Sequence, residues 1–246
     1  MSKIEGKTAL VTGANRGIGR AFVEELLAAG IARIYASARN PDTLADLVEQ
    51  GNGRVVPIAL DVTKADMILE VAALHTDVDL LINNAGIAAF EAIIGADNGD
   101  AARNEMETNY FGTFNMIRAF SPVLAKNGGG VIVNLASIAS HVNFPVLGSY
   151  SASKAAVHSL TQGVRAELAA QGTQVVGVYP GPVDTDMAES FPMDKTSPNV
   201  VVQAVLNGIE AGEEDVYPDP MAVDMHVGLL ADPKAVEKQA GEMLPE

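Results

Sequence analysis

Nearly continuous apolar runs alternate with helical patterns along most of this chain. The strand-like runs are residues 8–12, 34–37, 54–60, 78–83, 131–135 and 175–179, and long helices are expected at about 18–29, 101–125 and 150–170. Strands that are apolar throughout and separated by helices are typical of a parallel sheet covered on both faces. The sequence therefore predicts an α/β fold, a doubly wound parallel sheet with helices on both faces, formed as a single domain over residues 1–246.

Two segments interrupt this alternation. Residues 180–198 are rich in proline and polar residues and predict a long ordered loop, with a candidate substrate lid at about 184–198. Met187, Phe191 and Met193 would either line such a lid or pin the loop to the body of the protein. The last strand is expected at 214–220, followed by a C-terminal extension, about 221–246, with a helical segment near 232–243.

Charge and composition exclude several classes of function. The net charge of -15 repels phosphate backbones and anionic lipid, so we expect neither a nucleic-acid nor a membrane partner. The absence of cysteine rules out disulfides, thiolate catalysis and zinc-thiolate sites. The four histidines show no metal-ligand spacing, and no apolar leader opens the chain. We expect a cytoplasmic protein that acts on a small molecule and holds no metal.

A glycine-rich turn lies between the first predicted strand and the first helix. It reads Gly13-Ala14-Asn15-Arg16-Gly17-Ile18-Gly19. Glycine permits a tight turn and a close approach of the backbone to a phosphate, and the following helix N-terminus attracts the anion. No Gly-Lys-Ser/Thr follows, so the turn is not a Walker A loop. We predict that it binds the pyrophosphate of a dinucleotide.

The ends of the next strands refine this prediction. An acid commonly binds the ribose 2′-hydroxyl of NAD after the second strand, but Arg39 stands there instead, and Arg16 lies in the glycine turn. Two guanidinium groups suit a 2′-phosphate, so the cofactor is predicted to be NADP(H). Small residues and amides at the ends of the third and fourth strands would let the backbone pass close to the adenine and ribose. The residues predicted to bind the cofactor there are Asp61, Val62, Asn83, Ala85 and Gly86.

Tyr150 and Lys154 stand four residues apart at the start of a predicted helix, so their side chains share one face. An ammonium beside a phenol favours the phenolate and lowers its pKa from about 10. A tyrosine tuned in this way exchanges a proton with a carbonyl or alcohol oxygen.

Taken together, these residues resemble the short-chain dehydrogenase/reductase family in its single-domain, Rossmann-like form of about 250 residues. The motifs that carry the resemblance are Thr12-Gly13-x-x-x-Gly17-Ile18-Gly19, Asp61, Asn83-Asn84-Ala85-Gly86, Asn109, Ser137, Tyr150-x-x-x-Lys154 and Pro180-Gly181-Pro182-Val183-x-Thr185. They occur in the family's order and cover roughly residues 5–190.

The resemblance implies a role for each matching residue. Tyr150 would be the general acid/base, and Lys154 would lower its pKa and hold the nicotinamide ribose. Ser137 would orient the substrate oxygen, and Asn109 would hold a water that relays protons. Pro180, Gly181, Val183 and Thr185 would bind the nicotinamide end of the cofactor. The glycine-rich final segment of the family is missing here, so a tetramer is doubtful, whereas a homodimer through the two long helices stays plausible.

The resulting hypothesis is an NADP-dependent alcohol dehydrogenase or carbonyl reductase. It would move a hydride between nicotinamide and a ketone, an aldehyde or a secondary alcohol. The apolar stretch from Val142 to Leu147 favours a lipophilic substrate, and His141 would either touch substrate or be solvated. One alternative is a regulatory protein that binds NADP(H) without catalysis. Another, a sugar-nucleotide epimerase, would require a longer C-terminal region.

Overall fold

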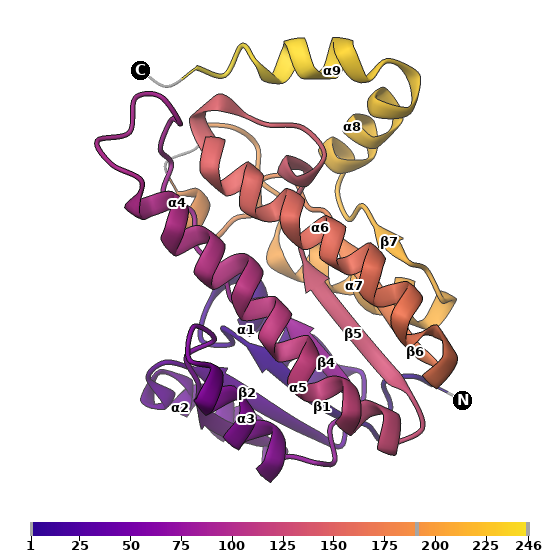
Figure 1. The fold of residues 1–246 in the computed structure, drawn as a ribbon. Coiled ribbons are helices and arrows are strands. Elements are labelled where there is room, and N and C mark those ends of the chain that lie inside the picture. The colour runs from indigo at the N-terminus through magenta and orange to yellow at the C-terminus, as the bar shows by residue number, and fades with distance from the viewer. Residues whose placement is uncertain (1, 190–191, 245–246) are drawn as a thin grey trace.

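The computed structural model describes residues 2–189 and 192–244, and its strands form a sheet whose neighbouring strands are all parallel. The strand order is β3-β2-β1-β4-β5-β6-β7. The strands are β1 (Thr8–Thr12), β2 (Arg33–Ala38), β3 (Val55–Ala59), β4 (Leu80–Asn83), β5 (Gly130–Leu135), β6 (Thr173–Val178) and β7 (Asp215–Val216). Figure 1 shows helices in front of this sheet and behind it, so the predicted doubly wound α/β fold is confirmed.

Helices cover both faces of the sheet. One layer is formed by α1 (Gly17–Ala28), α2 (Ala45–Gln50) and α7 (Pro198–Ala211), and the other by α3 (Ala65–Leu74), α5 (Thr113–Lys126) and α6 (Gly148–Leu168). Ala9 and Val11 belong to the first buried cluster, whereas Leu10 belongs to the second. Because successive strand residues face opposite layers, strands buried on both sides are apolar at most positions.

The two long predicted helices are present with one interruption. The segment predicted at 101–125 consists of α4 (Asp100–Glu105), a π-helical stretch (Met106–Gly112) and α5, which follow one another without a loop. The predicted 150–170 helix is α6, extended by a short 3₁₀ turn (Ala169–Gln171). The π-helical stretch carries Asn109, and π-bulges of this kind are frequent at functional sites.

The C-terminal third departs from the prediction. The expected strand 214–220 shrinks to the two residues of β7, and α8 (Pro220–Ala231) follows before α9 (Pro233–Ala240). The rest of the expected strand is replaced by the start of α8, because the Asp219 side chain caps that helix and Pro220 takes its first position. The sequence did not predict α3 or α7, and Pro198, the last residue of the predicted loop, opens α7.

The sheet order reverses between β1 and β4. From β1 the chain moves to β2 and β3 on one side and then returns to β4 on the other. Such a switch point leaves a crevice at the carboxyl ends of the strands, where ligands bind in open α/β sheets. Figure 1 shows α8 and α9 at this same end of the sheet. Within the described residues, no helix has both the length and the apolar character needed to cross a membrane.

Candidate active site

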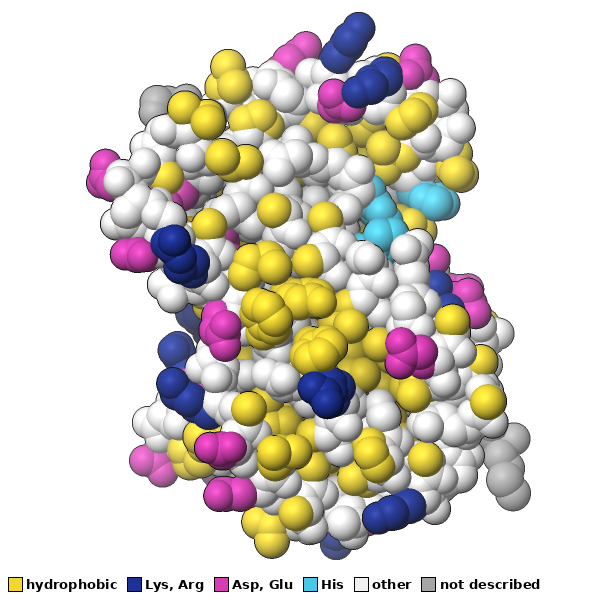
Figure 2. Space-filling model, viewed as in Figure 1, with side chains coloured by type: hydrophobic (Ala, Val, Ile, Leu, Met, Phe, Trp, Pro, Cys, Tyr) yellow, Lys and Arg dark blue, Asp and Glu magenta, His cyan; other side chains and the backbone are white. Residues whose placement is uncertain are grey.

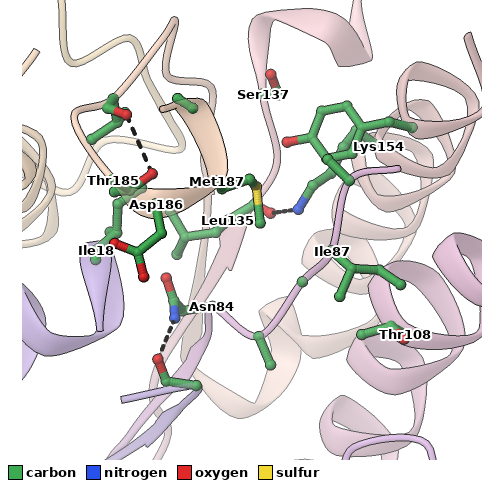
Figure 3. Close-up of a pocket in the computed structure, with 18 of the residues that line it drawn as sticks. Ile18, Asn84, Ile87, Thr108, Leu135, Ser137, Lys154, Thr185, Asp186 and Met187 are labelled. Carbon is green, nitrogen blue, oxygen red and sulfur yellow. Dashed lines mark hydrogen bonds between the residues drawn. The ribbon is translucent and has the colours of Figure 1, made fainter. Parts of the chain in front are cut away.

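A cavity of about 1080 Å³ lies along the carboxyl ends of the strands. One end is lined by the glycine turn and the ends of β2 and β3, the other by Ser137, Tyr150 and the C-terminal extension. Figure 3 shows Ile18, Thr185 and Asp186 on one side of the cavity, Ser137 and Lys154 on the other, and Asn84 between them. The topology thus brings together motifs that lie far apart in the sequence.

The glycine turn has the backbone geometry that the sequence predicted. Gly13 and Gly17 have φ angles of +65° and +53°, a region that other residues rarely adopt. A Cβ on Gly19 would lie 2.1 Å from the Gly13 carbonyl oxygen, so only glycine fits there. Gly13 and Gly17 line the cavity, whereas Gly19 stays behind the turn and allows it to close.

Thr12 and Asn84 join the two strands that flank the crevice. The Thr12 hydroxyl accepts hydrogen bonds from the backbone N–H groups of Asn84 and Ala85 at 2.9 and 3.0 Å. The Asn84 side chain donates to the Thr12 carbonyl at 2.8 Å and to the Gly13 carbonyl at 3.2 Å. These bonds fix the glycine turn against the end of β4 and set the width of the crevice between β1 and β4.

Asn83 lies outside the cavity, contrary to the prediction that it would line a cofactor site. It is the last residue of β4, 4% exposed, and its amide donates to Asn134 Oδ1 at 2.9 Å. Asn134 in turn donates to Thr161 of α6. Side chains alternate between the two faces of a strand, so Asn83 turns into the core, whereas Asn84 lines the cavity.

Cationic side chains gather at the β2–β3 end of the cavity. Arg16, Arg39 and Lys64 all line it, and Ala38 ends β2 with no carboxylate. Arg16 pairs with Asp186 at 3.0 Å, but both side chains are more than 60% exposed, so the pair is weak. Burial alone would raise the pKa of Asp61, but hydrogen bonds from Thr63 hold it below its ordinary value. Asp61 and Val62 line the cavity as predicted.

Tyr150, Ser137 and Lys154 meet at the other end. All three line the cavity, and the Lys154 ammonium lies 5.7 Å from the centre of the Tyr150 ring. Lys154 is 5% exposed, and its Nζ donates to the Leu135 carbonyl at 2.7 Å. Ser137 follows β5, and its Oγ accepts from Ala139 N at 3.1 Å and donates to the Pro180 carbonyl at 3.4 Å. The predicted face-sharing of Tyr150 and Lys154 is therefore present.

The protonation equilibria differ from the prediction. Burial raises the pKa of the Tyr150 phenol to about 12, with a smaller rise from the Glu105 carboxylate, while interaction with the Ser137 hydroxyl lowers it. Burial lowers the pKa of Lys154 to about 8. The two groups share one poorly solvated corner, and burial disfavours the charged form of each. Loss of solvation, and not the charge of Lys154, therefore dominates the pKa of Tyr150.

Asn109 stands behind the cavity wall. It is 1% exposed, its Oδ1 accepts from Ile87 N at 2.8 Å, and its Nδ2 donates to the Ile87 carbonyl and to Ser153 Oγ, both at 2.9 Å. Asn109 therefore holds the loop after β4 against α6. The predicted proton relay through a water at Asn109 stays a prediction.

The remaining predicted residues line the cavity. Those on the cofactor side are Asn15, Ile18, Ala85, Gly86, Pro180, Gly181, Val183 and Thr185. A Cβ on Gly86 would lie 3.1 Å from Asn109 Oδ1 and 3.5 Å from Lys154 Nζ. Glycine at this position therefore leaves room for both side chains.

The C-terminal extension lines part of the end of the cavity that holds Ser137 and Tyr150. The sequence suggested this tail as one segment that shapes a substrate pocket, but it identified no lining residue within it. Met221 of α8 and Met243, which follows α9, line the cavity. The Met243 carbonyl accepts from Val146 N at 3.1 Å, which ties the tail to the loop before α6. Met187 and Met193 of the predicted lid also line the cavity, whereas Phe191 lies outside the described residues. Only tertiary contacts bring this tail to the cavity, so no local sequence signal marked its lining residues.

His141 and His158 belong to a ring cluster beside the cavity. Their ring centres lie 4.6 Å apart, and each packs on Tyr179, whose hydroxyl lies 2.7 Å from His158 Nδ1. Tyr217 and His226 extend the stack, and Figure 2 shows histidine side chains together near the C-terminal helices. Burial lowers the pKa of His141 to about 4. His141 is thus a half-buried packing residue that does not line the cavity.

Known proteins resemble this chain in sequence and in fold. The family model described as short chain dehydrogenase matches residues 7–196. A short chain dehydrogenase from Burkholderia cenocepacia, solved in complex with NADP, superposes with a TM-score of 0.92 at 43% identity, covering 100% of both chains. The NADPH-dependent 1-acyldihydroxyacetone phosphate reductase of Saccharomyces cerevisiae is 38% identical over 78% of this chain and 66% of its own. The 3-oxoacyl-(acyl-carrier-protein) reductase of Vibrio cholerae is 32% identical over 94% and 92%. This chain therefore belongs to the short chain dehydrogenase family of oxidoreductases.

Proposed function

We propose that this protein is an NADP(H)-dependent oxidoreductase that interconverts a ketone or aldehyde with the corresponding alcohol, as an alcohol dehydrogenase or carbonyl reductase does. One observation carries the proposal: Tyr150, Ser137 and Lys154 line one end of a cavity whose other end is the glycine turn. In this reading residues 1–246 act as one catalytic domain, with the lid at about 184–198 and the extension from about 221 closing the substrate end.

The walls of the cavity fit a phosphorylated dinucleotide. Glycines with positive φ open the backbone at the N-terminus of α1, where a pyrophosphate is favoured. Arg39, Lys64 and Arg16 offer cations to a 2′-phosphate, and no carboxylate at the end of β2 opposes it. The NADP bound by the Burkholderia relative and the NADPH dependence of the yeast relative support this cofactor. When bound, NADP(H) supplies or accepts the hydride.

The chain's own residues then handle the substrate oxygen and its proton. Ser137 would donate a hydrogen bond to that oxygen and fix its direction. Tyr150 donates its proton to the oxygen in reduction and takes it back in oxidation. Lys154, held by the Leu135 carbonyl, keeps a positive charge next to the phenolate that reduction leaves. Val183 and Thr185 would hold the nicotinamide end so that one ring face meets the substrate.

The substrate we propose is lipophilic. The substrate end is formed largely by apolar side chains, namely Phe144, Val146, Leu147, Met187, Met221 and Met243. Methionine side chains adapt to irregular apolar shapes, which suits a bulky or extended carbonyl compound. Two relatives are named for reducing carbonyls in acyl derivatives, which agrees with this choice.

A panel of carbonyl compounds and secondary alcohols, assayed with NADPH and with NADH, tests this function. We expect turnover with bulky apolar carbonyls and a preference for NADPH, read from the absorbance of the reduced nicotinamide. Tyr150→Phe should abolish turnover and leave NADPH binding, followed by nucleotide fluorescence, nearly intact. Near-normal activity of this variant would refute the role of Tyr150. Binding of NADPH by the wild type without turnover of any compound would favour the regulatory alternative.

Arg39 tests the choice of cofactor. Replacing Arg39 by alanine removes a charge-assisted contact to a 2′-phosphate, which is worth about 1.5–3 kcal/mol. NADPH affinity should fall at least tenfold while NADH affinity stays the same, as measured by titration of each nucleotide. An equal change in both affinities would show that Arg39 does not read the 2′-phosphate.

We also propose a homodimer through the α5–α6 face. Figure 2 shows apolar side chains gathered over this face, and Phe111 is 44% exposed between α4 and α5. Sedimentation of the wild type and of Phe111→Glu measures the association directly. We expect a dimer that the variant weakens, and a monomeric wild type would contradict this proposal.

A further inference from the structure

Glu105 is a carboxylic side chain with no exposed surface next to the candidate active site. It ends α4 and is 0% exposed. Its Oε1 accepts from Ala89 N at 2.8 Å, and its Oε2 accepts from Ser149 Oγ at 2.5 Å. No lysine, arginine or histidine lies within ion-pairing distance of it in the described part of the chain. A buried carboxylate is costly unless such hydrogen bonds satisfy it, so both bonds matter for stability.

The two donors belong to two different walls of the cavity. Ala89 lies in the loop after β4, directly after the lining residues Ile87 and Ala88. Ser149 lies in the first turn of α6 and directly precedes Tyr150. One side chain therefore connects the loop over the substrate end to the turn that carries the proposed acid.

Asn109 repeats this arrangement one helical turn later. Its side chain bonds the Ile87 backbone on one side and Ser153 Oγ on the other, and Ser153 directly precedes Lys154. Glu105 and Asn109 are four residues apart, as are Ser149 and Ser153. Residues with this spacing lie on one face of a helix, so the same two helix faces are joined at two successive turns. The result is a pair of parallel cross-links, one beside Tyr150 and one beside Lys154.

We propose that Glu105 is a positioning residue for the reaction, which together with Asn109 holds the Tyr150–Lys154 face of α6 at a fixed distance from the loop after β4. This inference rests on the proposed function, because only a reacting Tyr150 makes its position matter for rate. An aliphatic side chain would fill the same space at less desolvation cost, but it would leave Ala89 N and Ser149 unpaired.

The charge of Glu105 adds a second, separable effect. The groups around Tyr150 are Lys154 on its own helix, Ser137 after β5, Glu105 on α4, and Tyr217 in the same apolar cluster. Apart from burial itself, the Glu105 carboxylate is the cause that raises the pKa of Tyr150. Removing this charge lowers that pKa, so the protonated form needed for reduction is lost at a lower pH.

The test compares Glu105→Gln, Glu105→Ala and the control Asp100→Asn. Asp100 begins the same helix, is 74% exposed and loses the same charge. Steady-state rates in both directions are measured against pH, with NADPH affinity alongside. Glutamine can keep both cross-links, so Glu105→Gln should retain kcat within about threefold. The midpoints of the pH–rate curves for reduction and for oxidation should both move down by roughly half a pH unit or more, the effect of removing one neighbouring charge. Glu105→Ala should lose about 10- to 100-fold in kcat with NADPH affinity unchanged.

Specific outcomes would overturn the proposal. They are a wild-type kcat in Glu105→Ala, an unmoved pH profile in Glu105→Gln, or an equal displacement in Asp100→Asn. If Glu105→Ala does not fold, the Glu105→Gln profile decides.

Hydrogen exchange separates this inference from the proposed function. Glu105→Ala should speed exchange in residues 86–90 and 148–154 together, even in a protein that turns over no substrate. A wild type without turnover would end the proposed function, whereas unchanged exchange in these two segments would end the cross-link.

Discussion

The buried Lys154 allows a direct measurement of how much the candidate active site lowers the free energy of unfolding. Its side chain is 5% exposed, and burial lowers its pKa from 10.5 to about 8. A lysine whose pKa is lowered by folding destabilises the folded state wherever the unfolded chain holds its proton more tightly. We therefore expect Lys154→Met, a replacement of similar length without charge, to stabilise the protein at neutral pH while removing activity.

The size and pH dependence of the effect follow from these two values. Each pH unit between them corresponds to about 1.4 kcal/mol, so the full destabilisation is about 3 kcal/mol at pH 7. It is complete below pH 8, where Lys154 is protonated in both states. It declines between pH 8 and 10.5, where the folded protein has lost this proton and the unfolded chain still holds it, so that stability rises with pH. At pH 9.5 roughly 1 kcal/mol remains. The lost hydrogen bond to Leu135 offsets about 1 kcal/mol at either pH.

Urea denaturation at pH 7 and pH 9.5 measures this difference. The variant should exceed the wild type by about 2 kcal/mol at pH 7, and the two should be nearly equal at pH 9.5. Tyr150 and other groups that titrate at high pH are common to both proteins and cancel in the comparison. Lys126→Met, at an exposed position in the last turn of α5, serves as control and should change stability by less than about 1 kcal/mol at both pH values. A variant no more stable than the wild type at pH 7, or a gain independent of pH, would refute the burial argument.

Two further substitutions test how the site is supported. Asp219 accepts a hydrogen bond from Gly181 N at 2.8 Å and caps α8. Asp219→Ala should therefore lower the free energy of unfolding, measured in urea, by about 2–4 kcal/mol and raise KM for the carbonyl. A stability within about 0.5 kcal/mol of the wild type, roughly the limit for a neutral surface change, would contradict this. In Gly19→Ala the new Cβ would lie 2.1 Å from the Gly13 carbonyl, so NADPH affinity should fall at least about tenfold. A Cβ on Gly163 of α6 would meet no atom within 4 Å, so the control Gly163→Ala should stabilise the protein by about 0.5–1 kcal/mol. Unchanged NADPH affinity in Gly19→Ala would show that the turn can relax.

The sequence alone determined the strands, the order of the site motifs and the chemistry they suggest. Apolar runs identify β1, β4, β5 and β6, since a parallel strand covered on both faces is apolar at most positions. Glycines that need positive φ identify the turn before α1, and the four-residue spacing identifies the shared face of Tyr150 and Lys154. These features are local: each depends on a backbone conformation or a helical period that neighbouring residues set.

Tertiary structure alone decided which side chains reach the cavity and what holds them there. Asn83 and Asn84 are chemically alike, and only the direction in which β4 ends sends one to the core and the other to Thr12. Met243 reaches the substrate end through a hydrogen bond to a residue 97 positions earlier. Glu105 becomes a cross-link because α4, the loop after β4 and the start of α6 meet at one point. Contacts between distant segments leave no periodic trace in any one of them, because they depend on the relative placement of elements and not on local conformation.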